Sequence, residues 1–238
     1  MIAAGLTIKW LGHACFLITT LAGSNIVFDP YAEQIGRALP PVKADVVFVS
    51  HEHLDHNAVD SLQGSAKVMK PLAGKSTESS VVPVGHFPTG RQRVVDHLVG
   101  NDLIYYTSVL TNHDSSAGSK RGTNTVRVIE TDGVRICHLG DLGHVLTEAQ
   151  IEAIGRVDVL MIPVGGVYTI DARQAKQVVA QLKPRIVLPM HYKTPWLKVK
   201  LDPVSKFTRG FKRVKYADKI VVSEASLPKE TTVLVLKY

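Results

Sequence analysis

Short apolar runs, separated by polar or glycine-containing breaks, recur along most of the chain. The run at 45–49, Asp-Val-Val-Phe-Val, is rich in β-branched residues, which is typical of a strand buried on both faces. Asp-Gly at 132–133 is a strong signal for a hairpin turn between two such runs. The pattern predicts strands at 6–11, 13–19, 24–28, 45–49, 66–71, 103–110, 125–130, 134–139, 158–163, 186–190, 220–223 and 231–236.

Helical patterns are fewer and lie mostly in the second half of the chain. Residues 147–150 and 171–174 match the capping box, so each should begin a helix. Behind the second box, apolar residues recur at helical spacing until Pro184 ends the pattern. Two more helices are expected at 57–62 and 203–214. Strands that come first and then alternate with helices are typical of an α/β sandwich.

Composition fits a single globular domain over residues 1–238. Hydrophobic residues make up 45% and charged residues 21%, as in an ordinary soluble protein. The net charge of +7 and the pI of about 9.4 favour anionic partners. Cys15 and Cys137 lie in strand-like runs and are expected to be buried, reduced thiols. Since neither a signal-peptide pattern nor an apolar run of roughly 20 residues is found, we expect a cytoplasmic protein with no membrane partner.

The strongest chemical signal directly follows the run at 45–49. Three histidines and an aspartate fall within six positions there: His51, His53, Asp55 and His56. In an extended backbone, residues two apart point the same way, so His51 and His53 can reach one ion. Asp55 and His56 come where the chain must turn and can reach a second point nearby. Because neutral imidazole and carboxylate suit zinc, iron or manganese, this segment predicts a metal site.

Three further candidate ligands, His113, Asp141 and His191, also follow apolar runs. By contrast, His86 and His97 lie in a segment whose apolar residues follow neither a strand period nor a helix period, and we interpret both as non-ligands. Two ions that are each four- or five-coordinate need about six or seven protein ligands and a water. The number of candidate ligands in this chain fits that requirement. We assign His51, His53 and His113 to one ion, Asp55, His56 and His191 to the other, and Asp141 to a position between them.

Several polar residues have both a catalytic and a structural interpretation. Tyr168, Tyr192, His13 and His144 could donate to a leaving group or an oxyanion, or could be hydrogen-bonded structural residues. We take His13 and His144 as candidate catalytic residues together with Asp55, which would ligate the second ion and also hold the nucleophile.

Two other features also have alternatives. Asp29 is either a turn residue, which we favour, or an acceptor that orients a metal-bound histidine. The lysine- and arginine-rich segment at 193–219 could collect an anionic substrate, but a solvated helical face explains it slightly better.

The ligand pattern His51-x-His53-x-Asp55-His56, His113, Gly140-Asp141 and His191 resembles the metallo-β-lactamase-fold hydrolases. More closely, the chain resembles their small single-domain branch, which includes ascorbate-6-phosphate lactonase-like proteins. The resemblance implies a four-layered αββα sandwich of two mixed β-sheets flanked by helices, with the metals at one edge between the sheets. It rests further on Gly12-His13, Asp29-Pro30, Gly122-x-Asn124, His138-Leu139-Gly140-Asp141, Pro163-Val164-Gly165 and Pro189-x-His191-Tyr192.

Departures from other branches of that fold narrow the expected function. The true β-lactamases place a cysteine among the ligands of the second ion, where this chain has Asp141, so antibiotic hydrolysis is not expected. Flavodiiron proteins have glutamate where His53 stands, and usually an added flavin domain. Relatives that process transfer RNA or cleave nucleic acids carry an RNA-gripping arm or an inserted domain, and this chain shows no comparable insertion.

The resulting expectation is a dinuclear metal-dependent hydrolase that uses a metal-bridging hydroxide on a small anionic ester, lactone or phosphodiester. The cofactors would be two divalent ions, with zinc expected and manganese, iron or nickel open. The alternatives are a nuclease, favoured only by net charge, and a non-hydrolytic iron-binding redox protein. The expected partner is a small anionic molecule rather than nucleic acid or a membrane, and assembly into a homo-oligomer is left open.

Overall fold

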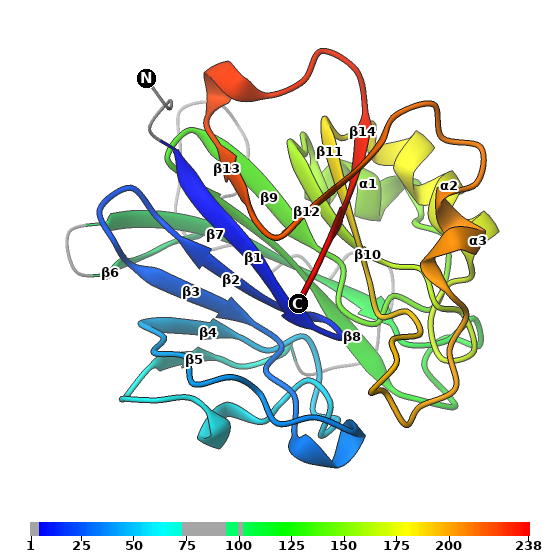
Figure 1. The fold of residues 1–238 in the computed structure, drawn as a ribbon, viewed down its shortest axis with the longest axis horizontal. Coiled ribbons are helices and arrows are strands. Elements are labelled where there is room, and N and C mark those ends of the chain that lie inside the picture. Colours follow the sequence, from blue (N-terminus) through cyan, green and yellow to red (C-terminus); the bar gives the residue numbers. More distant parts are fainter. Residues whose placement is uncertain (1–4, 73–93, 100–101) are drawn as a thin grey trace.

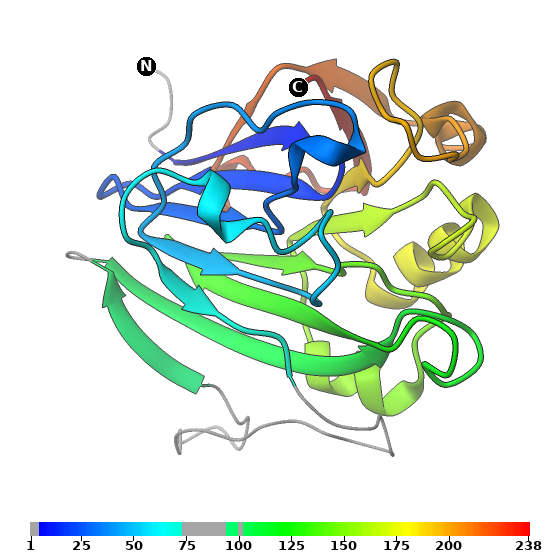
Figure 2. The ribbon, with the colours of Figure 1, turned by 90° about the horizontal axis from the view of Figure 1, so that it is seen from below.

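Two β-sheets packed face to face make up most of the molecule (Figure 1). The structure, a computed structural model, describes residues 5–72, 94–99 and 102–238. Seen from below in Figure 2, the two sheets form stacked layers, which confirms the predicted sandwich of two mixed sheets. His86 lies outside the described residues, and so does the side chain of His97, so our interpretation of both as non-ligands stays a prediction.

The six-stranded sheet has the order β13-β1-β2-β3-β4-β5. From β13 to β3 neighbouring strands are antiparallel, while β3, β4 and β5 run parallel. Because β3 and β4 are parallel, the segments that follow them emerge at the same edge of the sheet. The strands span Leu6–Gly12 (β1), Cys15–Thr19 (β2), Asn25–Phe28 (β3), Val46–Phe48 (β4), Lys67–Met69 (β5) and Ile220–Val222 (β13).

The eight-stranded sheet has the order β12-β14-β11-β10-β9-β8-β7-β6. It is parallel from β12 to β9 and antiparallel from β9 to β6, so β7, β9, β10 and β11 all end at the same edge. The strands span Val94–Val99 (β6), Asp102–Asn112 (β7), Thr123–Thr131 (β8), Val134–His138 (β9), Val159–Pro163 (β10), Ile186–Met190 (β11), Val214–Ala217 (β12) and Thr232–Leu236 (β14).

Both capping boxes begin helices, as predicted. In α1 (Glu148–Ile154), the backbone N–H of Gln150 donates to the Thr147 hydroxyl, and α2 (Ala172–Leu182) has the same arrangement at Asp171. The helix predicted at 203–214 is wrong in length. Only Val204–Thr208 (α3) is helical, because Gly210 takes a backbone φ of +93°, which a helix cannot continue through, and β12 follows.

The outer layer over the six-stranded sheet also differs from expectation. Side chains of a strand alternate between faces, so Ile26 and Phe28 join the core between the sheets while Val27 joins a smaller outer cluster. In the described residues, coil and two 3-10 turns, Glu33–Ile35 (η1) and Val59–Ser61 (η2), cover that cluster instead of α-helices. The helix predicted at 57–62 is therefore a single 3-10 turn.

Arg127 on β8 connects the two sheets at the edge where β4 and β5 end. The residue is buried, and its guanidinium donates to the carbonyls of Val49 (3.2 Å), Met69 (3.1 Å) and Lys70. Burial lowers the pKa of Arg127 to about 10, so the group stays charged at neutral pH. Since Val49 directly precedes the histidine-rich segment, this contact fixes where that segment begins.

We expect Arg127→Leu to lower the free energy of unfolding by about 3–5 kcal/mol, because buried carbonyl groups lose a charged donor. Denaturant unfolding measures the change. Arg156→Leu is the matched control: its side chain is 56% exposed and pairs with Asp158, so a loss below about 1 kcal/mol is expected. Equal losses in the two variants would contradict a stabilising role for the hydrogen bonds that Arg127 makes to the other sheet.

Both cysteines are buried and free, as predicted. Burial raises the pKa of the Cys137 thiol to about 12 and that of Cys15 well above its usual value, so neither forms a reactive thiolate at neutral pH. None of the helices in the described part of the chain combines the length and apolar character needed to cross a bilayer.

Candidate metal centre

The structure brings all seven predicted ligands together where the strands of the two sheets end. Four of them lie in the segment after β4, and His113, Asp141 and His191 follow β7, β9 and β11. All except His53, which is exposed, and Asp55, which is half-buried, are shielded from solvent. Buried imidazoles and carboxylates at converging strand ends are the arrangement expected of a metal centre.

Three groups of side chains there have ligand atoms within 4.8 Å of one another. The first group, His51, His53 and His113, is the set that the sequence assigns to one ion. The second contains the set assigned to the other ion and adds a residue from the β1–β2 turn. The third connects the two. The second and third groups are His13, Asp55, His56 and His191, and then His51, His56 and Asp141.

Asp141 lies at the middle of the cluster. Its Oδ2 is 3.1 Å from His113 Nε2 and 3.3 Å from His191 Nε2, and its Oδ1 is 3.2 Å from His56 Nε2. Yet Asp141 Oδ1, His56 Nε2 and His51 Nε2 are buried without any hydrogen-bond partner. Buried polar atoms are rarely left unpaired, and these are the atoms that bind divalent ions, so the residues fit a metal.

Asp29 and Ser50 hold two of the imidazoles in place. The Asp29 carboxylate, at the end of β3, accepts hydrogen bonds from the backbone N–H of Ser50 (2.7 Å), from its hydroxyl (2.6 Å) and from His56 Nδ1 (2.8 Å). The Ser50 hydroxyl in turn accepts from His51 Nδ1 (2.9 Å). Both imidazoles therefore present Nε2 to the cluster. For Asp29 this is the interpretation that we did not favour from the sequence.

Asn124 and Gly140 fix the position of Asp141. The Asn124 side chain accepts from the Asp141 backbone N–H (2.9 Å) and donates to the Leu139 carbonyl (2.9 Å). Gly140 has a φ of +54°, and a Cβ there would lie 2.3 Å from Asn124 Oδ1 and 2.6 Å from Ser50 Cβ. Only glycine fits this point, because a larger side chain would clash with both Asn124 and Ser50.

Comparison with known proteins agrees with this geometry. The family model described as a beta-lactamase superfamily domain matches residues 7–191. A UPF0173 metal-dependent hydrolase of Thermococcus kodakarensis is 31% identical over 211 residues, which cover 82% of this chain and 88% of the relative. The chain belongs to the UPF0173 metal-dependent hydrolase family of the metallo-beta-lactamase superfamily.

Solved structures show the same fold for this UPF0173 hydrolase. A protein of Thermotoga maritima, described as a Zn-dependent hydrolase of the metallo-beta-lactamase superfamily, is 36% identical with a TM-score of 0.71, and the match covers 97% of this chain and 98% of that one. Igni18, a metallo hydrolase of Ignicoccus hospitalis, is 20% identical with a TM-score of 0.59 and coverage of 98% and 96%, which supports the fold alone. The finer resemblance to ascorbate-6-phosphate lactonase-like proteins stays a prediction.

The other candidate residues of the UPF0173 hydrolase are placed differently. Both ring nitrogens of His144 are engaged by the backbone: Nε2 accepts from Asn112 N–H (3.2 Å) and Nδ1 lies 2.9 Å from the Val145 carbonyl. These contacts hold the turn after Asp141, and a catalytic role for His144 stays a prediction that they do not support. Tyr192 is buried against Trp10, with ring centroids 5.0 Å apart, as a core aromatic.

The electrostatics of the cluster favour the protonated form of His56. Burial and the neighbouring charge of His56 hold the pKa of His51 well below its usual value. Burial would lower the pKa of His56 too, but the carboxylates of Asp141 and Asp55 raise it well above its usual value. Burial alone would raise the pKa of Asp141, yet His191 and His56 hold it well below its usual range. At neutral pH the cluster therefore keeps a proton on His56.

We expect metal binding at pH 7 to release about one proton, because His56 must become neutral before it can ligate an ion. A raised pKa means that this proton is still bound at pH 7, so the apparent affinity should increase as the pH rises. Calorimetric titration with Zn²⁺ in two buffers of different ionisation enthalpy measures the number of protons released. Identical heats in both buffers would contradict the prediction.

Proposed function

We propose that this UPF0173 protein is a dinuclear hydrolase that acts on a small anionic ester, lactone or phosphodiester. The observation that carries the proposal is the position of Asp141, whose carboxylate lies against imidazoles from both ligand sets. One carboxylate between two ligand sets is an arrangement that suits a pair of ions. We propose zinc for both positions because three imidazoles with carboxylate, and no thiolate, suit it well.

In this proposal each side chain has a defined task. His51, His53 and His113 would hold one ion, Asp55, His56 and His191 the other, and Asp141 both. Two such ions lower the pKa of water and polarise a substrate oxygen, which is the chemistry that hydrolysis of an ester or phosphodiester requires. The protein orients the imidazoles of His51 and His56 through Ser50 and Asp29.

A cationic loop beside the cluster supports an anionic substrate. The loop begins at His113 and carries Lys120 and Arg121. The carboxylate of Asp114 accepts backbone hydrogen bonds of 2.7–3.0 Å from four residues of this loop, which fixes its shape: Ser116, Gly118, Lys120 and Arg121. A rigid loop presents its positive charges at a defined place, which favours recognition over non-specific attraction.

Arg121 also meets the loop that follows β10. Its guanidinium lies 3.4 Å from the Val167 carbonyl and 5.4 Å from the centre of the Tyr168 ring. Val167 has a φ of +61°, a strained conformation for a β-branched residue, and is 56% exposed. Strain of this kind gathers at ligand-binding sites. We infer that the Arg121–Tyr168 pair receives the charged end of the substrate.

The test is a panel of lactones, thioesters and phosphodiesters, each in an anionic and a neutral form, assayed with metal-loaded protein. Arg121→Met should raise KM about tenfold for anionic members only. Lys215→Met removes the same charge at an exposed position of β12. This variant should leave KM unchanged for the anionic and for the neutral members. No turnover of any member, or turnover that persists unchanged in Asp55→Ala, would reject the proposal. Salt-sensitive binding of nucleic acid would favour a nuclease instead, and redox-active iron an oxidative role.

A further inference from the structure

His13 occupies the turn between β1 and β2 in an unusual conformation. Its φ is +50°, and the residue is fully buried. Its backbone carbonyl accepts two hydrogen bonds, one from Trp10 Nε1 (3.0 Å) and one from the backbone N–H of His191 (2.9 Å). The carbonyl of His13 thus holds the backbone of a residue assigned to the second ion.

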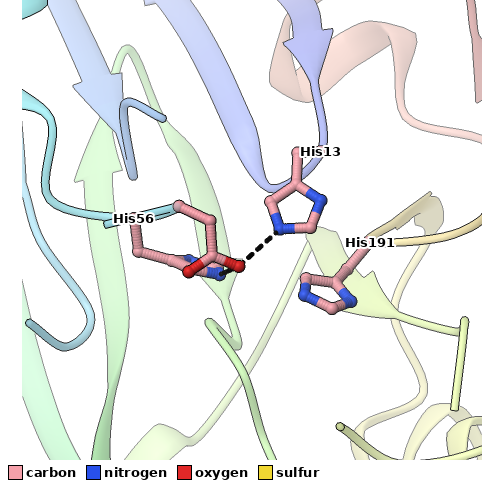
Figure 3. A group of neighbouring side chains, drawn as sticks. His13, His56 and His191 are labelled. Atoms are coloured by element: carbon pink, nitrogen blue, oxygen red, sulfur yellow. Dashed lines mark hydrogen bonds and ion pairs between the residues drawn. The ribbon is translucent and has the colours of Figure 1, made fainter. Parts of the chain in front are cut away.

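The side chain of His13 contacts the same part of the cluster. Figure 3 shows the rings of His13, His56 and His191 around one space, with a dashed line from His13 to a carboxylate. That carboxylate is Asp55, whose Oδ2 is 3.0 Å from His13 Nε2. The centroids of the His13 and His191 rings lie 4.1 Å apart.

The His13–Asp55 contact differs in geometry from the contact between His56 and Asp141. His56 Nε2 and Asp141 Oδ1 are only 3.2 Å apart, yet neither has a hydrogen-bond partner, as expected of two atoms that face a shared third body. His13 Nε2 and Asp55 Oδ2 instead meet with the geometry of a hydrogen bond. Since an ionised carboxylate can only accept, the proton is on His13 Nε2, and that nitrogen has no lone pair for an ion.

We propose that His13 is a positioning residue for the second ion. Its Nε2–H orients the Asp55 carboxylate, and its carbonyl fixes the backbone of His191. The inference rests on the proposed two-ion function. It replaces the earlier expectation that His13 donates to a leaving group, because the proton in question is engaged with Asp55. The first ion, held by a ligand set that His13 does not contact, should be unaffected.

Titration of the metal-free protein with Co²⁺, followed by visible absorption and metal analysis, tests this in two variants. In His13→Leu, which cannot donate, affinity for the second ion should fall about 10–100-fold, while that for the first changes less than about threefold. In His13→Gln, whose amide can donate to Asp55, both affinities and the absorption spectrum should match the wild type. Circular dichroism and thermal unfolding show whether each variant folds.

Three results would overturn the inference: no loss of the second ion in His13→Leu, equal loss of both ions, or a changed Co²⁺ spectrum in His13→Gln, which would make His13 a ligand. If the leucine variant fails to fold, the glutamine variant still decides through its spectrum. A wild-type protein that binds a single ion would reject the dinuclear function, and the effect of His13 on the Asp55 side of the cluster would remain measurable by itself.

Discussion

Asp141→Asn is expected to lower kcat/KM by about 10³-fold or more, equivalent to roughly 4 kcal/mol of transition-state stabilisation. The carboxylate is the group that lies against imidazoles of both ligand sets, at 3.1–3.3 Å from His113, His191 and His56. An amide has one acceptor oxygen and no charge, so it cannot serve two ions or balance the surrounding imidazoles. Metal analysis after dialysis should find fewer than two ions per chain.

Asp45→Asn provides the matched control for this effect. Asp45 also accepts a backbone hydrogen bond, from Asn25 N–H (2.7 Å), but it stands at the opposite end of β4 from the histidine-rich segment. This variant should bind two ions and keep its activity within about threefold of the wild type. Substitutions away from the site and the core usually have small effects. Full metal content and near-normal turnover in Asp141→Asn would show that Asp141 does not connect two ions.

The ligand cluster could be predicted from the sequence because its chemistry coincides with a structural signal. Each of His51, His113, Asp141 and His191 closely follows an apolar run, and strand ends in α/β proteins converge on one edge. The two capping boxes were equally local, and both begin helices. The family resemblance then supplied the sheet arrangement, which the periodicity alone did not determine.

The groups that orient the ligands could not be predicted in the same way. Asp29 before a proline is a common turn, and nothing local reveals that its carboxylate receives the loop that begins at Ser50. Arg127 gave no signal because its partners are backbone carbonyls of other strands. Within the described residues, coil and 3-10 turns cover the outer face of the six-stranded sheet, where the resemblance predicts helices. The residues of this layer are scattered along the sequence, so no local pattern indicates it.

Removing Asp29 should have the second-largest effect. We expect Asp29→Ala to weaken metal binding about 10–100-fold and to lower the free energy of unfolding by about 3–5 kcal/mol. Three buried donors lose their acceptor: the Ser50 N–H, the Ser50 hydroxyl and His56 Nδ1. His56 then loses its fixed orientation, and His51 loses part of its support through the Ser50 hydroxyl. Metal titration and denaturant unfolding of the metal-free protein measure the two losses separately.

Asp158→Ala distinguishes a specific role of Asp29 from a general cost of losing a buried carboxylate. Asp158 is also buried and accepts from the Arg135 backbone N–H (2.9 Å), but it lies just before β10, at the end of the strand away from the cluster. Its removal should destabilise the fold and leave metal affinity within about threefold of the wild type. If both variants lose stability and metal in the same proportion, metal loss merely follows unfolding. If only Asp29→Ala loses affinity beyond its loss of stability, the carboxylate at the end of β3 prepares the imidazoles before any ion arrives.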